Sequence, residues 1–466
     1  MHNERYGYKM KKTPASRARG LSAAAILFCA GMLILTVSLF INGALWSVHP
    51  GNLNLYKNGE LTYAGDVYDR DGLVLVSTTD GKREYNSDAS VRKATLHAIG
   101  DLGGYISTGI QTSFRAQLAG YDALNGLYTL DGHGNNIDLS INSALCVKAM
   151  NELGSRLGTV GIMNYKTGEL LCVYSSPAYD PNNPPDFSKE ADKYKGVYVN
   201  RLFSGFFAPG SIFKLVTACA AIDRLDGVFD KTWNCNRGFD VGDERLTCMG
   251  KHNDINFRDA LKVSCNATFG QITLELGRDT MLDYTKQLGF GGKYKLDGIS
   301  LEAGKYTLNG ASDLDFAWSG IGQHNDLVNP LHYLMFVSAI ANEGIAKSPH
   351  IIEGITTSYG LPQFAGQSTE KRYMSADTAN TLKGMMRDTV IGNYGDNKFP
   401  NLSLCAKSGT AELDKQTEPH SLFTGFMDDP EHPLAFIVVA ENSGSGSDIA
   451  ARISNNVLQA AVSLGL

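Results

Sequence analysis

The chain has 466 residues, of which 43% are hydrophobic and 19% charged, so it can bury a large core and is neither disordered nor a coiled coil. At roughly 100–200 residues per domain, this length allows two to four domains. The 42 basic and 48 acidic residues give a net charge of −6, which speaks against a protein that coats nucleic acid, since such proteins carry a basic excess.

A basic tail is followed by a long apolar segment. Residues 1–20 carry six basic side chains and one acid, and residues 21–56 carry no charged side chain. The first twenty apolar residues would span about 30 Å as a helix, the hydrocarbon thickness of a bilayer. We predict a cytoplasmic tail over 1–20 and a single transmembrane anchor over 21–45, with the rest of the chain outside the cell. A cleaved signal peptide is the alternative, but its apolar region would be shorter and no small-residue cleavage site follows.

The eight cysteines are scattered and form no Cys-x-x-Cys pair, so a zinc ribbon is not expected. Cys235 and Cys248 flank a polar, Gly-rich stretch typical of an exposed loop, and outside the cell they could form a disulfide. A metal site at Cys248 and His252 is not expected. Most other cysteines lie among apolar residues and are interpreted as core residues. The sequence therefore predicts no metal and no cofactor.

After the anchor, residues 46–135 are interpreted as a small α+β pedestal domain. The stretch AGDVYDRDGLVLV (64–76) predicts two strands joined by a turn at Asp71-Gly72. A second domain is predicted over 136–466. It begins with a hairpin formed by the apolar alternating runs 159–165 and 169–175.

The second domain is predicted to be one sheet covered by helices, an α+β fold. Residues 208–225 begin with Pro-Gly and continue with apolar residues at helical spacing, which predicts a helix with Ser211 as its cap. Strands and a last helix are predicted near the C-terminus, the strands over 403–412, 420–428 and 433–442 and the helix over 448–465. No internal repeat of 20–50 residues occurs.

Three short motifs carry the chemistry of this domain. They are Ser211-Ile212-Phe213-Lys214, Ser264-Cys265-Asn266 and Lys407-Ser408-Gly409-Thr410. Each is weak alone, because similar triplets and quartets recur at 90–93, 140–142, 166–168, 368–371 and 454–456. Context separates them: only Ser211 opens an apolar helix, and only Lys407 lies on a predicted strand of the terminal sheet. Their order is that of penicillin-binding enzymes.

The first motif fits a serine nucleophile with a lysine base. Residues three apart on a helix share a face, so Lys214 can reach the Ser211 hydroxyl. Serine needs a neighbour to take its proton, and lysine does this only when neutral. The pKa of Lys214 must therefore fall by roughly 3 units. Desolvation and a second cation, for which Lys407 is the candidate, both act in that direction.

The second motif places a hydroxyl and an amide opposite the nucleophile. Ser264 can relay a proton to a leaving amine, and Asn266 can hold the peptide bond of a substrate. The alternative interpretation of Asn266-Ala267-Thr268 is a glycosylation sequon.

The third motif fits the binding of a carboxylate. Lys407 offers a fixed positive charge, and the Ser408 and Thr410 hydroxyls can bind the anion. Gly409 lets the substrate backbone approach closely. Backbone N–H groups of Ser211 and Thr410 would form an oxyanion hole, a contribution often worth about 3–4 kcal/mol.

The chain resembles the class B penicillin-binding proteins, which are membrane-anchored peptidoglycan D,D-transpeptidases. The stretches that carry the resemblance include DVYDRDG (66–72), TGELLCVYSSPAYDPN (167–182), FAPGSIFK (207–214), VSCN (263–266), GIGQHNDLVNPL (320–331), AKSGTAE (406–412) and FTGFMDDP (423–430). The resemblance implies an antiparallel five-stranded sheet covered by helices, with an all-helical subdomain. It also implies that Gln323 helps to shape the pocket.

The implied reaction is cross-linking of stem peptides. Ser211 would attack the penultimate D-Ala carbonyl, release D-Ala and pass the acyl group to an amine of a neighbouring stem. Beta-lactams would acylate the same serine. No glycosyltransferase domain is expected within the chain, so a multi-span glycosyltransferase and divisome or elongasome proteins are the implied partners.

Departures and alternatives qualify this interpretation. Ala64-Gly65 stands where the family usually has Arg-Gly, Ser408 replaces the common threonine, and the pedestal is short. A D,D-carboxypeptidase would differ only in using water as acceptor. A serine beta-lactamase would need Glu-x-x-Leu-Asn, but Lys305 precedes Leu308-Asn309 at that offset. A membrane-bound beta-lactam sensor would need a signalling domain, which the short tail does not offer.

Overall fold

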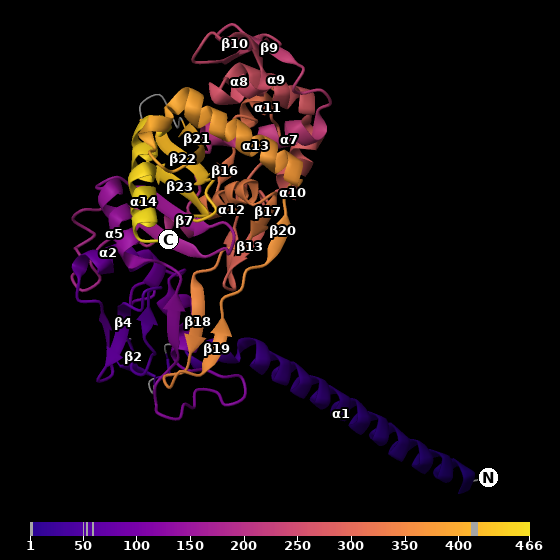
Figure 1. The fold of residues 1–466 in the computed structure, drawn as a ribbon. Coiled ribbons are helices and arrows are strands. Elements are labelled where there is room, and N and C mark those ends of the chain that lie inside the picture. The colour runs from indigo at the N-terminus through magenta and orange to yellow at the C-terminus, as the bar shows by residue number, and fades with distance from the viewer. Residues whose placement is uncertain (1–2, 50, 53–54, 58–59, 412–417) are drawn as a thin grey trace.

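The computed structural model describes residues 3–49, 51–52, 55–57, 60–411 and 418–466. Met1 and His2 of the predicted tail, and Glu412 at the end of AKSGTAE, lie outside the described residues. Figure 1 shows a long N-terminal helix that leaves a lower body, and an upper body stacked on the lower one.

Helix α1 (Asn3–Ser47) contains the predicted anchor. Within its segment Ser16–Ser47, the most apolar 18-residue window has a mean hydropathy of 2.6, and none of that window is buried. The helix projects away from both bodies (Figure 1). The helix is long and apolar enough to cross a membrane. Exposure of so many apolar side chains to water would be unfavourable.

The lower body is built on a six-stranded sheet with the order β19-β18-β6-β3-β4-β5. The strands are β3 (Val67–Tyr68), β4 (Val74–Thr79), β5 (Lys82–Tyr85), β6 (Asn136–Leu139), β18 (Ile352–Thr356) and β19 (Pro362–Ala365). The predicted turn at Asp71-Gly72 joins β3 to β4, and Gly72 has a φ of +79°. Because β6, β18 and β19 come from the region predicted as the second domain, a boundary at residue 135 does not separate the two sheets.

Arg83, on β5, is buried against the backbone that precedes β3. It donates from Nη1 to the carbonyl oxygens of Gly65 at 2.6 Å and Ala64 at 3.3 Å, and from Nε to Gln111 at 3.1 Å. A Cβ on Gly65 would lie 2.0 Å from the Asn135 carbonyl oxygen. Glycine is therefore required at this position, and the cation that contacts the Ala64-Gly65 backbone comes from β5.

The upper body contains a five-stranded, fully antiparallel sheet with the order β21-β22-β23-β7-β8, as predicted. The strands are β7 (Gly158–Asn164), β8 (Leu170–Ser176), β21 (Leu404–Ala411), β22 (His420–Met427) and β23 (Leu434–Ala440). Figure 1 shows α5 (Ser143–Leu153) and α14 (Ala451–Ser463) on one side and α12 (Pro330–Ala341) on the other. Because helices cover both faces of this sheet, every residue of β8, β22 and β23 is buried.

A helical subdomain lies beside the edge strand β21. Its helices are α7 (Lys214–Arg224), α8 (Phe257–Lys262), α9 (Asn266–Leu276), α10 (Arg278–Gln287), α11 (Asp313–Ser319) and α13 (Ala376–Thr389). Contrary to what the resemblance implied, the subdomain is not all-helical. It also contains two short ribbons, in which β9 (Thr232–Cys235) pairs with β12 (Asn253–Asn256) and β10 (Gly238–Val241) with β11 (Glu244–Thr247). These four strands are short and rich in polar residues, so the sequence has no clear alternation of apolar and polar residues that would predict them.

The other short elements connect these parts. They are β1 (Tyr56–Lys57), β2 (Glu60–Leu61), α2 (Ala89–Ile99), α3 (Ile110–Ser113), α4 (Arg115–Leu118), α6 (Arg201–Ser204), β13 (Lys293–Leu296), β14 (Ile299–Glu302), β15 (Gly304–Lys305), β16 (Leu327–Val328), β17 (Ile345–Lys347) and β20 (Glu370–Arg372).

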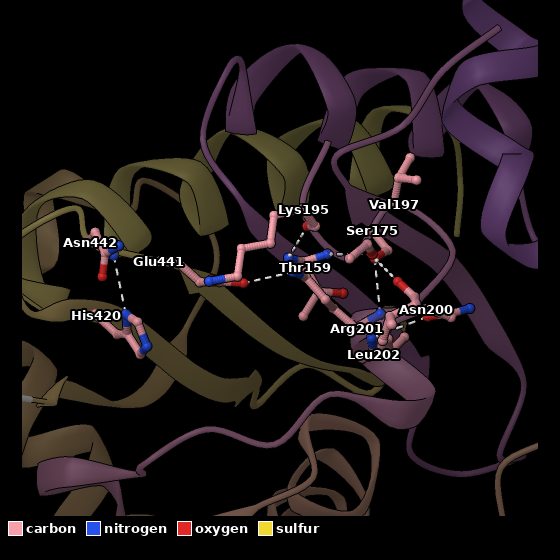
Figure 2. Close-up of polar contacts among 12 residues, drawn as sticks. Thr159, Ser175, Lys195, Val197, Asn200, Arg201, Leu202, His420, Glu441 and Asn442 are labelled. Carbon is pink, nitrogen blue, oxygen red and sulfur yellow. Dashed lines mark hydrogen bonds and ion pairs between the residues drawn. The ribbon is translucent and has the colours of Figure 1, made fainter. Parts of the chain in front are cut away.

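Figure 2 shows how the segment before the first motif is tied to the upper sheet. Arg201 pairs with Glu441 just after β23, with 2.6 Å between Nε and Oε1. Its guanidinium also donates to the carbonyls of Gly196 at 3.1 Å and Lys195 at 3.2 Å, and its backbone N–H donates to Ser175 Oγ at 2.9 Å. Arg201 thus links a loop, β8 and the end of β23.

Replacing Arg201 by alanine is expected to lower the free energy of unfolding by about 3 kcal/mol, because Glu441 would be left in a largely buried position without its partner. Arg245→Ala is the matched control, since Arg245 pairs with Asp240 in an exposed position and should cost under about 1 kcal/mol. Urea unfolding of the two variants measures the loss of free energy of unfolding in each. Equal losses would contradict the role assigned to Arg201.

Candidate active site

Ser211 lies in a 3-10 turn, Gly210–Phe213, that leads into α7. Gly210 has a φ of +53°, and a Cβ there would lie 2.6 Å from the Thr410 carbonyl oxygen, so glycine lets this turn pack against β21. The prediction that Ser211 caps the helix is wrong: the N-cap positions of the 3-10 turn and of α7 are Pro209 and Phe213. The Ser211 hydroxyl instead faces Lys214 at 3.0 Å, because the 3-10 turn brings residues i and i+3 into line.

The Lys214 amine is fully buried and joins the first two motifs. Its Nζ lies 3.0 Å from Ser211 Oγ and 3.1 Å from Ser264 Oγ. It donates to the Ser264 carbonyl oxygen at 2.7 Å and to Asn266 Oδ1 at 2.7 Å. The motifs at residues 211 and 264 thus converge on one nitrogen atom, as the sequence predicted.

This arrangement suits a neutral amine. A neutral amine has two N–H donors and one lone pair, whereas an ammonium has three donors and no acceptor. The two shortest contacts of Lys214 are to the Ser264 carbonyl and the Asn266 amide oxygen, which can only accept. Both donors are then used, and the lone pair remains for the Ser211 O–H, which is the geometry a general base needs.

Burial is also the main electrostatic influence on this amine. It lowers the pKa of Lys214 from 10.5 to about 7, while the thiols of Cys248 and Cys265 act in the opposite direction. Lys407 is equally buried, and burial followed by the charge of Lys214 lowers its pKa well below the usual value. Of the two predicted causes, desolvation and a second cation at Lys407, desolvation is therefore the main one for Lys214, and the charge effect between the two amines lowers the pKa of Lys407. Repulsion opposes protonation of both amines at once.

Ser264 stands between the two amines, in the turn that separates α8 from α9. Its Oγ lies 3.1 Å from Lys214 Nζ and 3.0 Å from Lys407 Nζ, so it can pass a proton from one amine to the other. Its φ is +56°, a conformation that costs a non-glycine residue about 1 kcal/mol or more and is common at functional sites. Asn266 begins α9, and besides Lys214 it contacts the Thr247 carbonyl through Nδ2 at 3.4 Å.

The third motif lies on β21, at the edge of the sheet. Ser408 and Thr410 share one side of the strand and line the cleft that Ser211 faces. Lys407 lies beneath the cleft and donates to the Ser408 carbonyl at 3.0 Å. A Cβ on Gly409 would lie 2.8 Å from the Pro209 carbonyl, so glycine here also allows the nucleophile turn to pack on β21.

Tyr394 is a site residue that sequence reasoning missed. Its hydroxyl lies 2.9 Å from Ser408 Oγ and accepts from the Ser408 backbone N–H at 2.8 Å. It therefore holds the hydroxyl that was predicted to bind the substrate carboxylate. No motif indicated it, because Tyr394 lies 14 residues upstream in a separate turn and only tertiary structure brings it to β21.

The cleft has a volume of about 850 Å³ and is lined by residues of all three motifs, among them Ser211, Ser264, Asn266, Ser408 and Thr410. Gln323 also lines it. Its loop is fixed to the nucleophile turn, because the Gly210 N–H donates to the Gly322 carbonyl at 2.9 Å. A second cleft of about 830 Å³ lies between the lower sheet and α12 and holds none of the predicted site residues.

The competing motif matches are not part of this site. Ser90, Lys93 and Lys166 are exposed, and Ser368 donates to the Ser348 carbonyl at 2.7 Å. The converging residues place a serine hydroxyl 3.0 Å from a buried amine, with a second hydroxyl and the edge strand β21 at the same cleft. This arrangement is suited to acyl transfer through a covalent serine ester.

Residues 158–459, well over half of the chain, match the family described as the penicillin-binding protein transpeptidase domain. The chain belongs to this family. The resemblance, the fold class and the enzyme class expected from the sequence are thereby confirmed.

This penicillin-binding protein is similar to peptidoglycan D,D-transpeptidases of other bacteria along much of its length. It is 25% identical over 456 residues to the peptidoglycan D,D-transpeptidase PbpA of Mycolicibacterium smegmatis, covering 88% of this chain and 90% of the relative. It is 26% identical over 357 residues to the peptidoglycan D,D-transpeptidase MrdA of Acinetobacter baumannii, covering 68% of this chain and 52% of that one. The penicillin G acyl-enzyme structure of Mycobacterium tuberculosis penicillin-binding protein A shares the fold, with a TM-score of 0.74, 23% identity and coverage of 86% of this chain and 99% of that chain.

Acylation of this penicillin-binding protein by a labelled penicillin is expected to accelerate as the pH rises through about 7 and then to level off. The base is the neutral amine of Lys214, so each pH unit below its pKa should lower the rate about tenfold. The titratable groups that face Lys214 are Lys407, Cys248 and Cys265. Acylation rate constants measured across this range provide the test, and a flat profile would show that Lys214 is not the base.

Proposed function

We propose that this protein is a membrane-anchored peptidoglycan D,D-transpeptidase that cross-links stem peptides and is acylated by beta-lactams. The observation that carries this proposal is the convergence of Ser211, Ser264 and Asn266 on the buried amine of Lys214. The two named relatives are peptidoglycan D,D-transpeptidases, and the M. tuberculosis structure is an acyl-enzyme complex with penicillin G.

In the proposed first step, Ser211 Oγ attacks the penultimate D-Ala carbonyl carbon while its proton moves to Lys214. The oxyanion is held by the backbone N–H groups of Ser211 and Thr410. The proton then passes through Ser264 to the nitrogen of the terminal D-Ala as the C–N bond breaks. D-Ala leaves, and the stem peptide remains as an ester on Ser211.

In the second step, an amine of a neighbouring stem attacks the ester carbonyl and loses a proton to the Lys214 amine. The new amide forms as the ester C–O bond breaks, and Ser211 recovers its proton. During the first step the Ser408 and Thr410 hydroxyls bind the terminal carboxylate, with the buried amine of Lys407 beneath the strand. Gly409 lets the substrate backbone approach closely. Asn266 and Gln323 position the peptide.

The proposed topology places the N-terminus in the cytoplasm and the catalytic domain outside the cell, since the basic residues of α1 lie before its apolar segment. A multi-span glycosyltransferase would supply the glycan strands and would contact the anchor and pedestal, within a divisome or an elongasome. Protease added to spheroplasts is expected to digest the bodies after α1. Full protection would contradict this topology.

Donor and acceptor stem peptides distinguish the candidate activities. A transpeptidase yields a cross-linked product whose mass equals both peptides minus one D-Ala, whereas a D,D-carboxypeptidase yields only the shortened donor. A serine beta-lactamase would turn over penicillin rapidly, and a sensor would hold the label without processing peptides. Release of D-Ala without any cross-linked product would overturn the proposal in favour of carboxypeptidase activity.

A further inference from the structure

Three cysteines and a histidine meet beside the active site, in a group that we call the thiol–imidazole cluster: Cys235, Cys248, His252 and Cys265. Their ligand atoms all lie within 4.8 Å of one another. Cys235 ends β9, Cys248 follows β11, His252 precedes β12, and Cys265 caps α9. Both ribbons and helix α9, which begins with Asn266, therefore contribute side chains to one cluster.

Three of the six distances between ligand atoms in the cluster are close to those of a tetrahedral metal site. With bonds of about 2.3 Å to sulfur and about 2.0 Å to nitrogen, tetrahedral zinc separates two sulfurs by about 3.8 Å and a sulfur from a nitrogen by about 3.5 Å. Cys248 and Cys265 Sγ lie 3.9 Å apart. His252 Nδ1 lies 3.4 Å from Cys235 Sγ and 3.7 Å from Cys248 Sγ.

We propose that the thiol–imidazole cluster is a structural zinc site. Four protein ligands with three sulfurs and one imidazole form a closed set that leaves no open position for a substrate or water, as in structural rather than catalytic sites. Thiolate-rich tetrahedral sites favour zinc over calcium or magnesium, which prefer oxygen. Binding releases the thiol protons to solvent and involves no change of oxidation state.

The backbone already holds these ligands in place. The Cys248 N–H donates to the Arg237 carbonyl and the His252 N–H to the Cys235 carbonyl, each at 3.0 Å. Cys235 and Cys265 are fully buried, whereas His252 is half-buried at the rim. Two ribbons of four residues per strand hold little apolar core of their own, so a metal is an effective way to fix them.

The alternative that the sequence left open, a disulfide between Cys235 and Cys248, is not formed: all eight cysteines are free. The expectation of no metal site followed from the absence of a Cys-x-x-Cys pair. The actual spacing is Cys-x12-Cys-x3-His-x12-Cys, in which only Cys248 and His252 are close in sequence. Folding of the ribbons brings the other two ligands in.

The position of Cys265 connects the proposed zinc to catalysis. Cys265 lies between Ser264 and Asn266, both of which contact Lys214. Cys248 also lines the cleft. A zinc ion would pin the turn that holds Ser264 in its left-handed conformation, so Cys265 and the other ligands act as positioning residues rather than catalytic ones.

The test begins with the metal content of the full chain, purified in detergent without added metal or chelator. Elemental analysis is expected to find about one zinc per chain. Cobalt exchanged for zinc should give the intense visible absorption of a tetrahedral thiolate site. Mass spectrometry of the denatured protein should find no loss of two hydrogens from Cys235, Cys248 or Cys265.

His252→Ala and His252→Cys form a matched pair at the half-buried rim of the cluster. The alanine variant is expected to lose zinc during dialysis, whereas the cysteine variant retains it as a four-sulfur site. Cys146→Ala, in α5, should leave the metal content unchanged. Wild-type protein without zinc or cobalt binding, or with a disulfide within the cluster, would overturn the proposal.

Zinc content and enzyme activity are separate readouts. If penicillin labels Ser211 but no metal binds, the zinc proposal fails and the transpeptidase proposal stands. If zinc binds but penicillin does not label Ser211, the zinc proposal stands and the transpeptidase proposal fails. Where both hold, removal of zinc from His252→Ala should slow acylation by about 10- to 100-fold, while His252→Cys remains near wild type.

Discussion

Replacing Ser211 by alanine is expected to abolish covalent labelling by penicillin while the protein stays folded. The side chain is half-buried at the cleft, so the loss of one hydroxyl leaves the packing of the turn intact. Without Oγ no ester can form, and residual binding is noncovalent. The measurement is the mass of the intact chain after incubation with penicillin, followed by mapping of the modified peptide to Ser211 in the wild type.

Ser90→Ala is the matched control, because Ser90 opens the competing Ser-x-x-Lys sequence and is exposed. It should label like the wild type. Thermal unfolding of both variants shows whether either has lost its structure. A label that persists in Ser211→Ala, or that maps to another serine in the wild type, would remove the basis of the proposed function.

Replacing Lys214 by methionine is expected to lower the acylation rate by about 10³-fold, within the range typical of a lost general base. Methionine retains most of the side-chain volume but cannot accept the Ser211 proton. The Ser264 carbonyl and Asn266 Oδ1 would also lose their donor, so a moderate loss of stability should accompany the loss of rate. Stopped-flow acylation kinetics and thermal unfolding measure the two effects separately.

Lys93→Met is the control for this change, since Lys93 belongs to the other early Ser-x-x-Lys sequence and is exposed. The pH profile adds a second readout: Lys214→Met should lose the rise through about pH 7 that the wild type shows. An unchanged profile in the variant would assign the titration to another group, of which Lys407 is the nearest candidate.

Much of the catalytic site could be predicted from sequence because each motif lies within one turn or strand. The Ser211–Lys214 contact follows from helical spacing, and the Lys407 strand follows from its apolar alternation. The sequence predicts that desolvation lowers the pKa of Lys214, but how completely the amine is buried could not be predicted in the same way. Burial depends on how α9 and β21 pack around the amine, and that packing is a property of tertiary structure.

Contacts between distant segments were the ones that the sequence did not indicate. Tyr394 reaches Ser408 from a separate turn, and the β18–β19 hairpin joins a sheet formed mainly by residues before 140. The thiol–imidazole cluster draws its ligands from residues 235 to 265, with long polar gaps between most of them. Local patterns report periodicity and turns, and they carry no signal for pairings of this kind.

The β18–β19 hairpin has a mechanical consequence for a protein held by a single helix. The chain passes from the lower sheet to the upper body after β6, returns at β18 and leaves again after β19 (Figure 1). A single connecting strand would permit the upper part to swivel about it, whereas several strands restrain both bending and torsion. The cleft is therefore held at a fixed distance and orientation relative to the end of α1. A force that a neighbouring protein applies to the pedestal would be transmitted to the upper body and its cleft.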